Sequence, residues 1–202
     1  ICRAVAQKLG REFKPETVNF DSVIPAVISG KADLAAAGIT ITEDRKKNVD
    51  FSIPYVKTGI VVIFKKSNPF TTVDALKGKK IGVQAGTTGD IYCTDDYGQE
   101  NVKQFPNGSL AVQALLNDQV ECVVIDNEPA KAFVKANDGL KILDTEYANE
   151  DYAAAIAKDN TELLEKFNNA LAELTEDGTV EKIISKYISD KRVIKLLKNM
   201  KI

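Results

Sequence analysis

The sequence contains no histidine among its 202 residues. Histidine is the commonest general base in enzymes, a frequent activator of nucleophiles and the commonest metal ligand. Acid–base sites, nucleophilic sites and metal sites would therefore all lack the residue that they most often use. This absence argues against an enzyme mechanism and against a metal site, and no cofactor is expected.

Long apolar runs and an excess of positive charge are also missing. No apolar run approaches the roughly 18 residues that a membrane-spanning helix needs. The net charge of −2 provides no surplus of cations to neutralise phosphates, so nucleic acid is not an expected partner. No secretory leader is recognisable either, because the chain opens at Ile1 in a helical pattern. We expect that a leader was removed or that the N-terminus is incomplete.

Cysteine is scarce and widely spaced, at Cys2, Cys93 and Cys122. No Cys-x-x-Cys pair exists, which leaves a zinc site or a thioredoxin-like site without support. Cys122 lies in the apolar run 120–125, which predicts a buried strand, and small buried thiols are the interpretation we favour. One disulfide stays open, and the sequence does not choose its pair.

What the chain does contain is an alternation of apolar runs and helical patterns. Hydrophobic residues make up 44%, as in ordinary globular proteins. Short apolar runs predict strands, and apolar residues at helical spacing predict helices in the last third. The predicted strands include 18–20, 33–38, 60–64, 81–83, 120–125 and 140–143, and the predicted helices include 110–116, 128–136, 163–174 and 180–188. This order predicts an α/β fold with helices on both faces of its sheets.

Open α/β sheets bind ligands beyond the carboxyl ends of their strands. That rule directs attention to three turns, at 36–45, 84–90 and 126–129. In the first, Gly38 allows close approach of the backbone, and Thr40 offers a hydroxyl and an amide. Arg45 offers a planar fork suited to a carboxylate, and from a helix that begins near Thr42 it can point back at the strand end. The alternative is that Arg45 forms an ordinary ion pair.

The second turn places Gly86, Thr87 and Thr88 at the start of a helix, where partial positive charge favours anions. The alternative is a plain helix cap. In the third turn, Asp126 ends an apolar strand and could hold an ammonium group. It could equally cap the helix that starts near Glu128.

Phe20 completes the candidate set, either as a core residue or as the apolar wall of a pocket. A guanidinium and hydroxyls suit an α-carboxylate, and an acid suits an α-ammonium. Taken together, the three turns therefore predict a site for the zwitterionic end of a free amino acid.

Four segments also match one known signature: 38–45 (GITITEDR), 49–55 (VDFSIPY), 76–88 (LKGKKIGVQAGTT) and 124–126 (VID). They resemble the signature of the bacterial polar amino-acid-binding proteins, in particular those that bind glutamine, histidine or arginine. These are type II periplasmic-binding-protein folds that serve ABC importers. The resemblance implies a two-lobed α/β fold in which each lobe is a mixed sheet flanked by helices.

The resemblance also implies a role for each candidate residue. Arg45, with Thr40 and the amide of Thr88, would hold the α-carboxylate of the ligand. Asp126, the carbonyl of Gly38 and the hydroxyl of Thr40 would hold its α-ammonium. The expected partners are a free amino acid and the membrane permease of an ABC transporter, outside the cytoplasm, either in the periplasm or on a cell-surface lipoprotein.

Three more residues concern the side chain of the ligand: Phe20 would stack on it, and Gln84 and Thr87 lie where selectivity is often set. The family begins with a strand and a loop that this sequence does not show, so the first strand of lobe one is apparently missing. The family pattern places lobe one at 1–57 and 153–202 and lobe two at 58–152. A basic tail at 190–202 is not part of that pattern.

Two other functions remain open on the same fold. A ligand-sensing domain of a receptor would bind the α-carboxylate and α-ammonium of the amino acid in the same way. A lyase similar to cyclohexadienyl dehydratase would need a poised acid or base in place of a merely complementary charge. The absence of histidine and the ammonium-binding position of Asp126 argue against the lyase, so we expect that the protein is not an enzyme.

Overall fold

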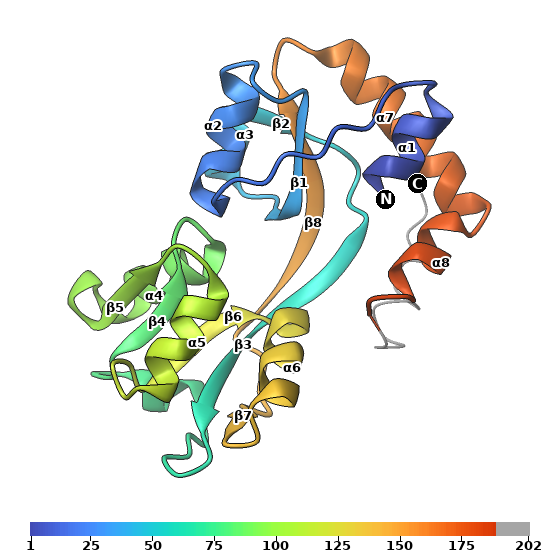
Figure 1. The fold of residues 1–202 in the computed structure, drawn as a ribbon. Coiled ribbons are helices and arrows are strands. Elements are labelled where there is room, and N and C mark those ends of the chain that lie inside the picture. Colours follow the sequence, from blue (N-terminus) through green and yellow to red (C-terminus); the bar gives the residue numbers. More distant parts are fainter. Residues whose placement is uncertain (189–202) are drawn as a thin grey trace. The chain divides into compact units, whose positions relative to one another are not determined.

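The computed structural model describes residues 1–188, so the tail predicted at 190–202 lies outside the described residues. Contacts between Cα atoms divide the chain into two compact units. Unit 1 comprises 1–18, 22–57 and the chain from 151 onward, and unit 2 comprises 19–21 and 58–150. The long strands β3 (Val56–Lys65) and β8 (Ala148–Ala157) contribute residues to both units (Figure 1).

In unit 2 the sheet has the order β3-β6-β4-β5 and is mixed. β3 runs antiparallel to β6, and β4 runs parallel to both β6 and β5. A short strand, β7, pairs with the outer end of β3. The bounds are β4 Ile81–Gln84, β5 Val102–Phe105, β6 Cys122–Asp126 and β7 Leu140–Ile142.

The apolar run of β3 is buried on both faces of this sheet because each face is covered by helices. Ile60, Val62 and Phe64 belong to one core cluster, whereas Val61 and Ile63 belong to another. Successive side chains of a strand point to opposite faces, so a continuous apolar run is what a doubly covered strand requires. The covering helices follow strands β4, β5 and β6: α4 Thr88–Tyr97, α5 Gly108–Leu116 and α6 Asn127–Ala136 (Figure 1). Two 3₁₀ turns, η2 Val73–Leu76 and η3 Gln99–Asn101, complete the unit.

In unit 1, strands β1 (Leu34–Thr40) and β2 (Val49–Phe51) both pair antiparallel with β8. The mixed sheet expected of each lobe is therefore seen in unit 2, whereas these ladders of unit 1 are antiparallel because both strands run against the same partner. The helices are α1 Cys2–Lys8, α2 Val23–Ile28, α3 Glu43–Lys46, α7 Thr161–Glu176 and α8 Thr179–Ile184.

The core of unit 1 lies where α7 covers β8. Phe167, Ala170, Leu171 and Leu174 recur at helical spacing and are buried together with Ile156 of β8. This confirms the helix predicted at 163–174, and the helix predicted at 180–188 is found as the shorter α8.

The strands predicted at 60–64, 81–83 and 120–125 are confirmed in β3, β4 and β6. The strand predicted at 18–20 is wrong. Residues 11–19 have no regular structure, and Phe20–Ser22 forms a 3₁₀ turn that leads directly into α2. The cause is that a short apolar pattern does not by itself supply a pairing partner, and tertiary context decides such cases.

Candidate functional site

The candidate residues of unit 1 meet where β1 ends and α3 begins. Thr42 caps α3, since its side chain accepts a hydrogen bond from the backbone N–H of Arg45 at 3.2 Å. The guanidinium of Arg45 then turns back, and Nη1 donates to the carbonyl oxygen of Thr40 at 2.9 Å. Both side chains are buried, with 6% of Thr40 and 9% of Arg45 exposed. This is the geometry that the five-residue spacing predicts, and it fixes a cation at the end of a strand.

Gly38 produces an irregularity just before that strand end. The register between β1 and β8 shifts between Ala35 and Ile39, and Gly38 has a φ of +66°. A Cβ atom there would lie 3.2 Å from the ring of Tyr152, so both the backbone conformation and the close packing require glycine. Burial raises the pKa of the Tyr55 hydroxyl, and a hydrogen bond with the backbone of Gly38 opposes that shift.

In unit 2, the turn from β4 to α4 is organised by Thr87 at the N-cap position. Its hydroxyl donates to the carbonyl oxygen of Gln84 at 2.8 Å and accepts from the backbone N–H of Asp90 at 3.3 Å. The helix-cap interpretation is therefore confirmed for Thr87. Gln84, the last residue of β4, is half-buried beside this turn.

Thr88 follows as the first residue of α4, with only 3% of it exposed. Its hydroxyl donates to Oε2 of Glu150 at 2.8 Å. Glu150 is itself buried, with 8% exposed, and lies on β8. A hydrogen bond to a buried carboxylate is charge-assisted and stronger than one between neutral groups. No sequence pattern indicated this contact with Glu150, because the two residues are 62 positions apart.

Asp126 is the last residue of β6 and occupies the N-cap position of α6. Its side chain makes no capping hydrogen bond, so the capping interpretation fails on this point. In the ladder with β3, Asp126 stands opposite Ile60, which is almost fully buried. The carboxylate thus lies at the end of an apolar strand and beside an apolar neighbour.

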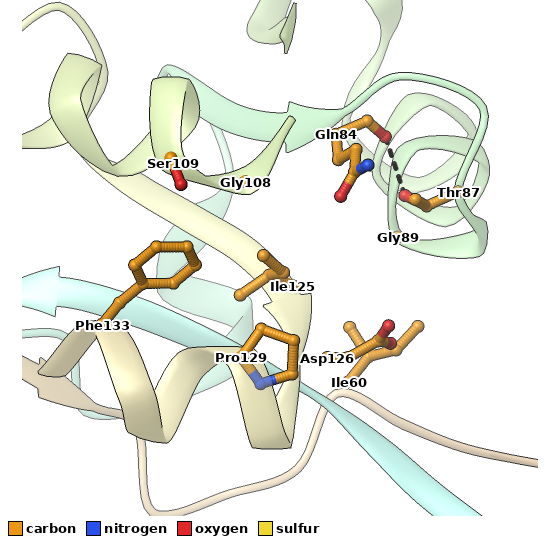
Figure 2. A pocket seen from close by; sticks show the side chains of 10 residues that line it. All are labelled: Ile60, Gln84, Thr87, Gly89, Gly108, Ser109, Ile125, Asp126, Pro129 and Phe133. Carbon is orange, nitrogen blue, oxygen red and sulfur yellow. Dashed lines mark hydrogen bonds between the residues drawn. The ribbon is translucent and has the colours of Figure 1, made fainter. Parts of the chain in front are cut away.

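Unit 2 contains a cavity of about 160 Å³ next to these residues (Figure 2). It is bounded by residues of β3, β4 and β6 and by residues of α4, α5 and α6, the helices that follow three neighbouring parallel strands. The ten lining residues are Ile60, Gln84, Thr87, Gly89, Gly108, Ser109, Ile125, Asp126, Pro129 and Phe133. A cavity beyond the carboxyl ends of parallel strands is where α/β sheets bind ligands.

The structure thus gathers Gly38, Thr40 and Arg45 at the end of β1, and Gln84, Thr87 and Asp126 around the cavity of unit 2. Thr88 adjoins this cavity in sequence, through Gly89, but does not line it. Phe20 lies in the 3₁₀ turn and is half-buried, and it is not a lining residue of the cavity.

Sequence reasoning missed Gly108 and Ser109 of α5 and Phe133 of α6. A signal was present, because the turn at 106–109 follows a strand just as the other turns do. That strand, β5, has only four residues and its two central side chains are polar, so no apolar run revealed it.

No group of three or more Cys, Asp or Glu side chains within residues 1–188 is arranged to hold a metal ion. In the same part of the chain, no helix combines the length and the hydropathy that crossing a bilayer demands. The three cysteines are free, and burial raises the pKa of Cys93 to about 12. These groups take no part in the cavity.

The sequence matches the family model of the bacterial extracellular solute-binding proteins, family 3, over residues 1–190. The chain belongs to this family. Its likeness to individual family 3 proteins extends over most of each protein. It is 34% identical to an ABC transporter arginine-binding protein of Escherichia coli over 188 residues, which cover 91% of this chain and 77% of that protein.

Two solved structures of amino-acid-binding proteins are also similar to this family 3 chain. One is an ancestral arginine-binding protein bound to glutamine, with 44% identity, a TM-score of 0.88, and coverage of 94% of this chain and 85% of the other. The other is the arginine-, lysine-, histidine-binding protein ArtJ of Geobacillus stearothermophilus, with 31% identity, a TM-score of 0.90, and coverage of 98% and 87%. The family confirms the α/β periplasmic-binding-protein fold and a binding rather than an enzymatic role.

Proposed function

We propose that this protein binds one free polar amino acid by its α-carboxylate and α-ammonium and delivers it to the membrane permease of an ABC importer. The observation that carries the proposal is the cavity of unit 2, in which Asp126 is the only ionisable side chain among the ten lining residues. A single carboxylate at the edge of an otherwise neutral cavity suits one ammonium group.

Arg45 supplies the complementary charge in this proposal. Its guanidinium is buried and held at the end of β1 by the carbonyl of Thr40, so it is preorganised for a planar carboxylate. The arginine- and glutamine-bound relatives support the choice of an amino acid, and the extracellular family supports a place outside the cytoplasm.

Isothermal titration calorimetry against the twenty common amino acids tests the proposal. We expect binding of one molecule per chain for at least one polar amino acid. Asp126→Asn should weaken that binding by on the order of 100-fold, because an ammonium group then faces a neutral amide. Asp95→Asn, at an exposed position on α4, is the matched control and should bind normally. A folded protein that binds none of the twenty would refute the proposal.

A further inference from the structure

The core beneath α4 contains two of the three cysteines. Cys93 lies on α4 and Cys122 begins β6, and both are fully buried in one core cluster of unit 2. Cys2 packs against the core cluster of unit 1 instead. Of the three pairs that the sequence leaves open, the structure therefore favours the pair of Cys93 and Cys122.

The packing of α4 on β6 places these two cysteines on facing surfaces. A Cβ atom at Gly89 would lie 3.5 Å from Cγ1 of Val124 and 3.6 Å from its carbonyl oxygen, so the helix backbone approaches the strand closely there. Cys93 follows Gly89 by one helical turn and lies on the same face of α4. Cys122 precedes Val124 by two residues, so both of their side chains point to the same side of the sheet.

The direction of the chain preserves this match. Because β4 and β5 are parallel neighbours, α4 between them must run back across the sheet, opposite to the parallel strand β6. The four residues from Gly89 to Cys93 advance the helix by about 6 Å. The two residues from Val124 to Cys122 cover about 7 Å of strand in the same direction. Cys93 therefore lies at the level of Cys122.

Two further observations support a bond between these thiols. Burial raises the pKa of Cys122, and the nearby thiol of Cys93 raises it further, so the two groups lie within electrostatic reach of each other. The chain belongs to an extracellular family, and disulfides form and persist in oxidising compartments outside the cytoplasm.

We propose that Cys93 and Cys122 form a disulfide bond that fastens α4 to β6 when the protein folds under oxidising conditions. The structure, in which both thiols are free, corresponds to the reduced form. Because the bond closes the loop formed by residues 93–122, it removes conformations from the unfolded chain and stabilises the folded one. It also joins the helix that starts after Thr87 to the strand that ends at Asp126, next to the cavity.

A disulfide compound such as oxidised glutathione serves as the oxidant. The thiolate of one cysteine attacks it, forms a mixed disulfide and releases one glutathione thiol. The second cysteine then attacks the sulfur of the first, closes the Cys93–Cys122 bond and releases the second glutathione thiol. The two cysteines together lose two electrons and two protons, and the oxidant takes them up. Since both side chains are buried in the folded protein, the reaction takes place while the chain folds.

Mass spectrometry after oxidative refolding tests the proposal. The chain is unfolded in urea, reduced and refolded with reduced and oxidised glutathione, and the remaining thiols are then alkylated in denaturant. We expect Cys93 and Cys122 to escape alkylation. Trypsin cleaves after Lys103, between the two cysteines, so their bond joins two peptides that a reductant separates.

Protein secreted into an oxidising compartment of an expression host provides a second preparation that needs no refolding. The same joined peptides are expected from it. Recovery of Cys93 and Cys122 as free thiols in the folded protein, or a bond from either of them to Cys2, would overturn the proposal.

Thermal unfolding with and without a reductant measures the consequence of the bond. The oxidised protein should melt about 10 °C higher than the reduced one, the shift expected for a loop of this length in a chain of this size. Cys122→Ala should melt at the same temperature under both conditions, because it cannot form the bond. Cys2→Ala is the matched control and should keep the full difference. Equal melting temperatures of the two forms of the unchanged protein, or a difference that Cys122→Ala retains, would contradict the proposal.

Discussion

The two units build their candidate binding residues in different ways. In unit 1, Arg45 reaches the carbonyl of Thr40 within one strand end and one short helix, so the geometry is local in sequence. In unit 2, the cavity gathers side chains from β3, from the ends of β4 and β6 and from three helices, spread from Ile60 to Phe133. The position of a charged side chain that depends only on neighbouring residues can be predicted from a sequence motif. The lining of a pocket that is made of distant segments cannot.

The largest effect is expected from the local element. Arg45→Ala should cost about 2–5 kcal/mol of ligand-binding free energy, because a desolvated carboxylate loses its partner. Arg45→Lys should recover part of this loss, since an ammonium keeps the charge but lacks the planar fork. Calorimetry with the preferred amino acid gives the energies, and urea unfolding shows whether the lost bond to Thr40 also affects stability. Near-normal affinity of the alanine variant would place the carboxylate at another residue.

An intermediate effect is expected where unit 2 depends on distant segments. Thr88→Val keeps the shape of the side chain but removes the hydroxyl that donates to the buried carboxylate of Glu150. Leaving that carboxylate with one donor fewer should lower the free energy of unfolding by about 1–3 kcal/mol, measured by urea denaturation.

Thr94→Val provides the matched control for this prediction on the same helix. The hydroxyl of Thr94 is buried and has no hydrogen-bond partner within residues 1–188, so its removal should be neutral or stabilising. If the two valine variants lose the same stability, the bond between Thr88 and Glu150 contributes nothing, and the contrast between the units weakens.

The smallest effect concerns the core beneath α4. Burial raises the pKa of Cys93 from 9.0 to about 12 in the folded protein, so the native state keeps its proton while the unfolded chain loses it. Below pH 9 both states are protonated and stability is unaffected. As the pH rises from 9 to 10, the free energy of unfolding should fall by about 1 kcal/mol through this thiol.

Urea denaturation at several pH values measures this dependence. Cys93→Ala should show a shallower decline than the unchanged protein over the same range, whatever its stability at neutral pH. Parallel declines in the two proteins would mean that Cys93 ionises as easily in the folded chain as in the unfolded one.

By itself, the sequence determined the α/β class, the buried strands within β3, β4 and β6, and the turn that aims Arg45 at the end of β1. Each of these depends on the periodicity of a continuous segment or on residues five positions apart, and chain geometry fixes such relations locally. The strand-end turns pointed to Thr87 and Asp126 as candidates and the family resemblance to Gln84, and all three line the cavity.

Only the tertiary structure decided which distant segments share the cavity and where Glu150 lies. Ser109 and Phe133 line the same cavity as Asp126 because strands β5, β4 and β6 lie side by side in the sheet. The order of strands in a sheet cannot be predicted from a local sequence pattern. The failed strand at 18–20 has the same cause. A strand exists only when a partner supplies its hydrogen bonds, and that partner is chosen by the packing of the whole unit.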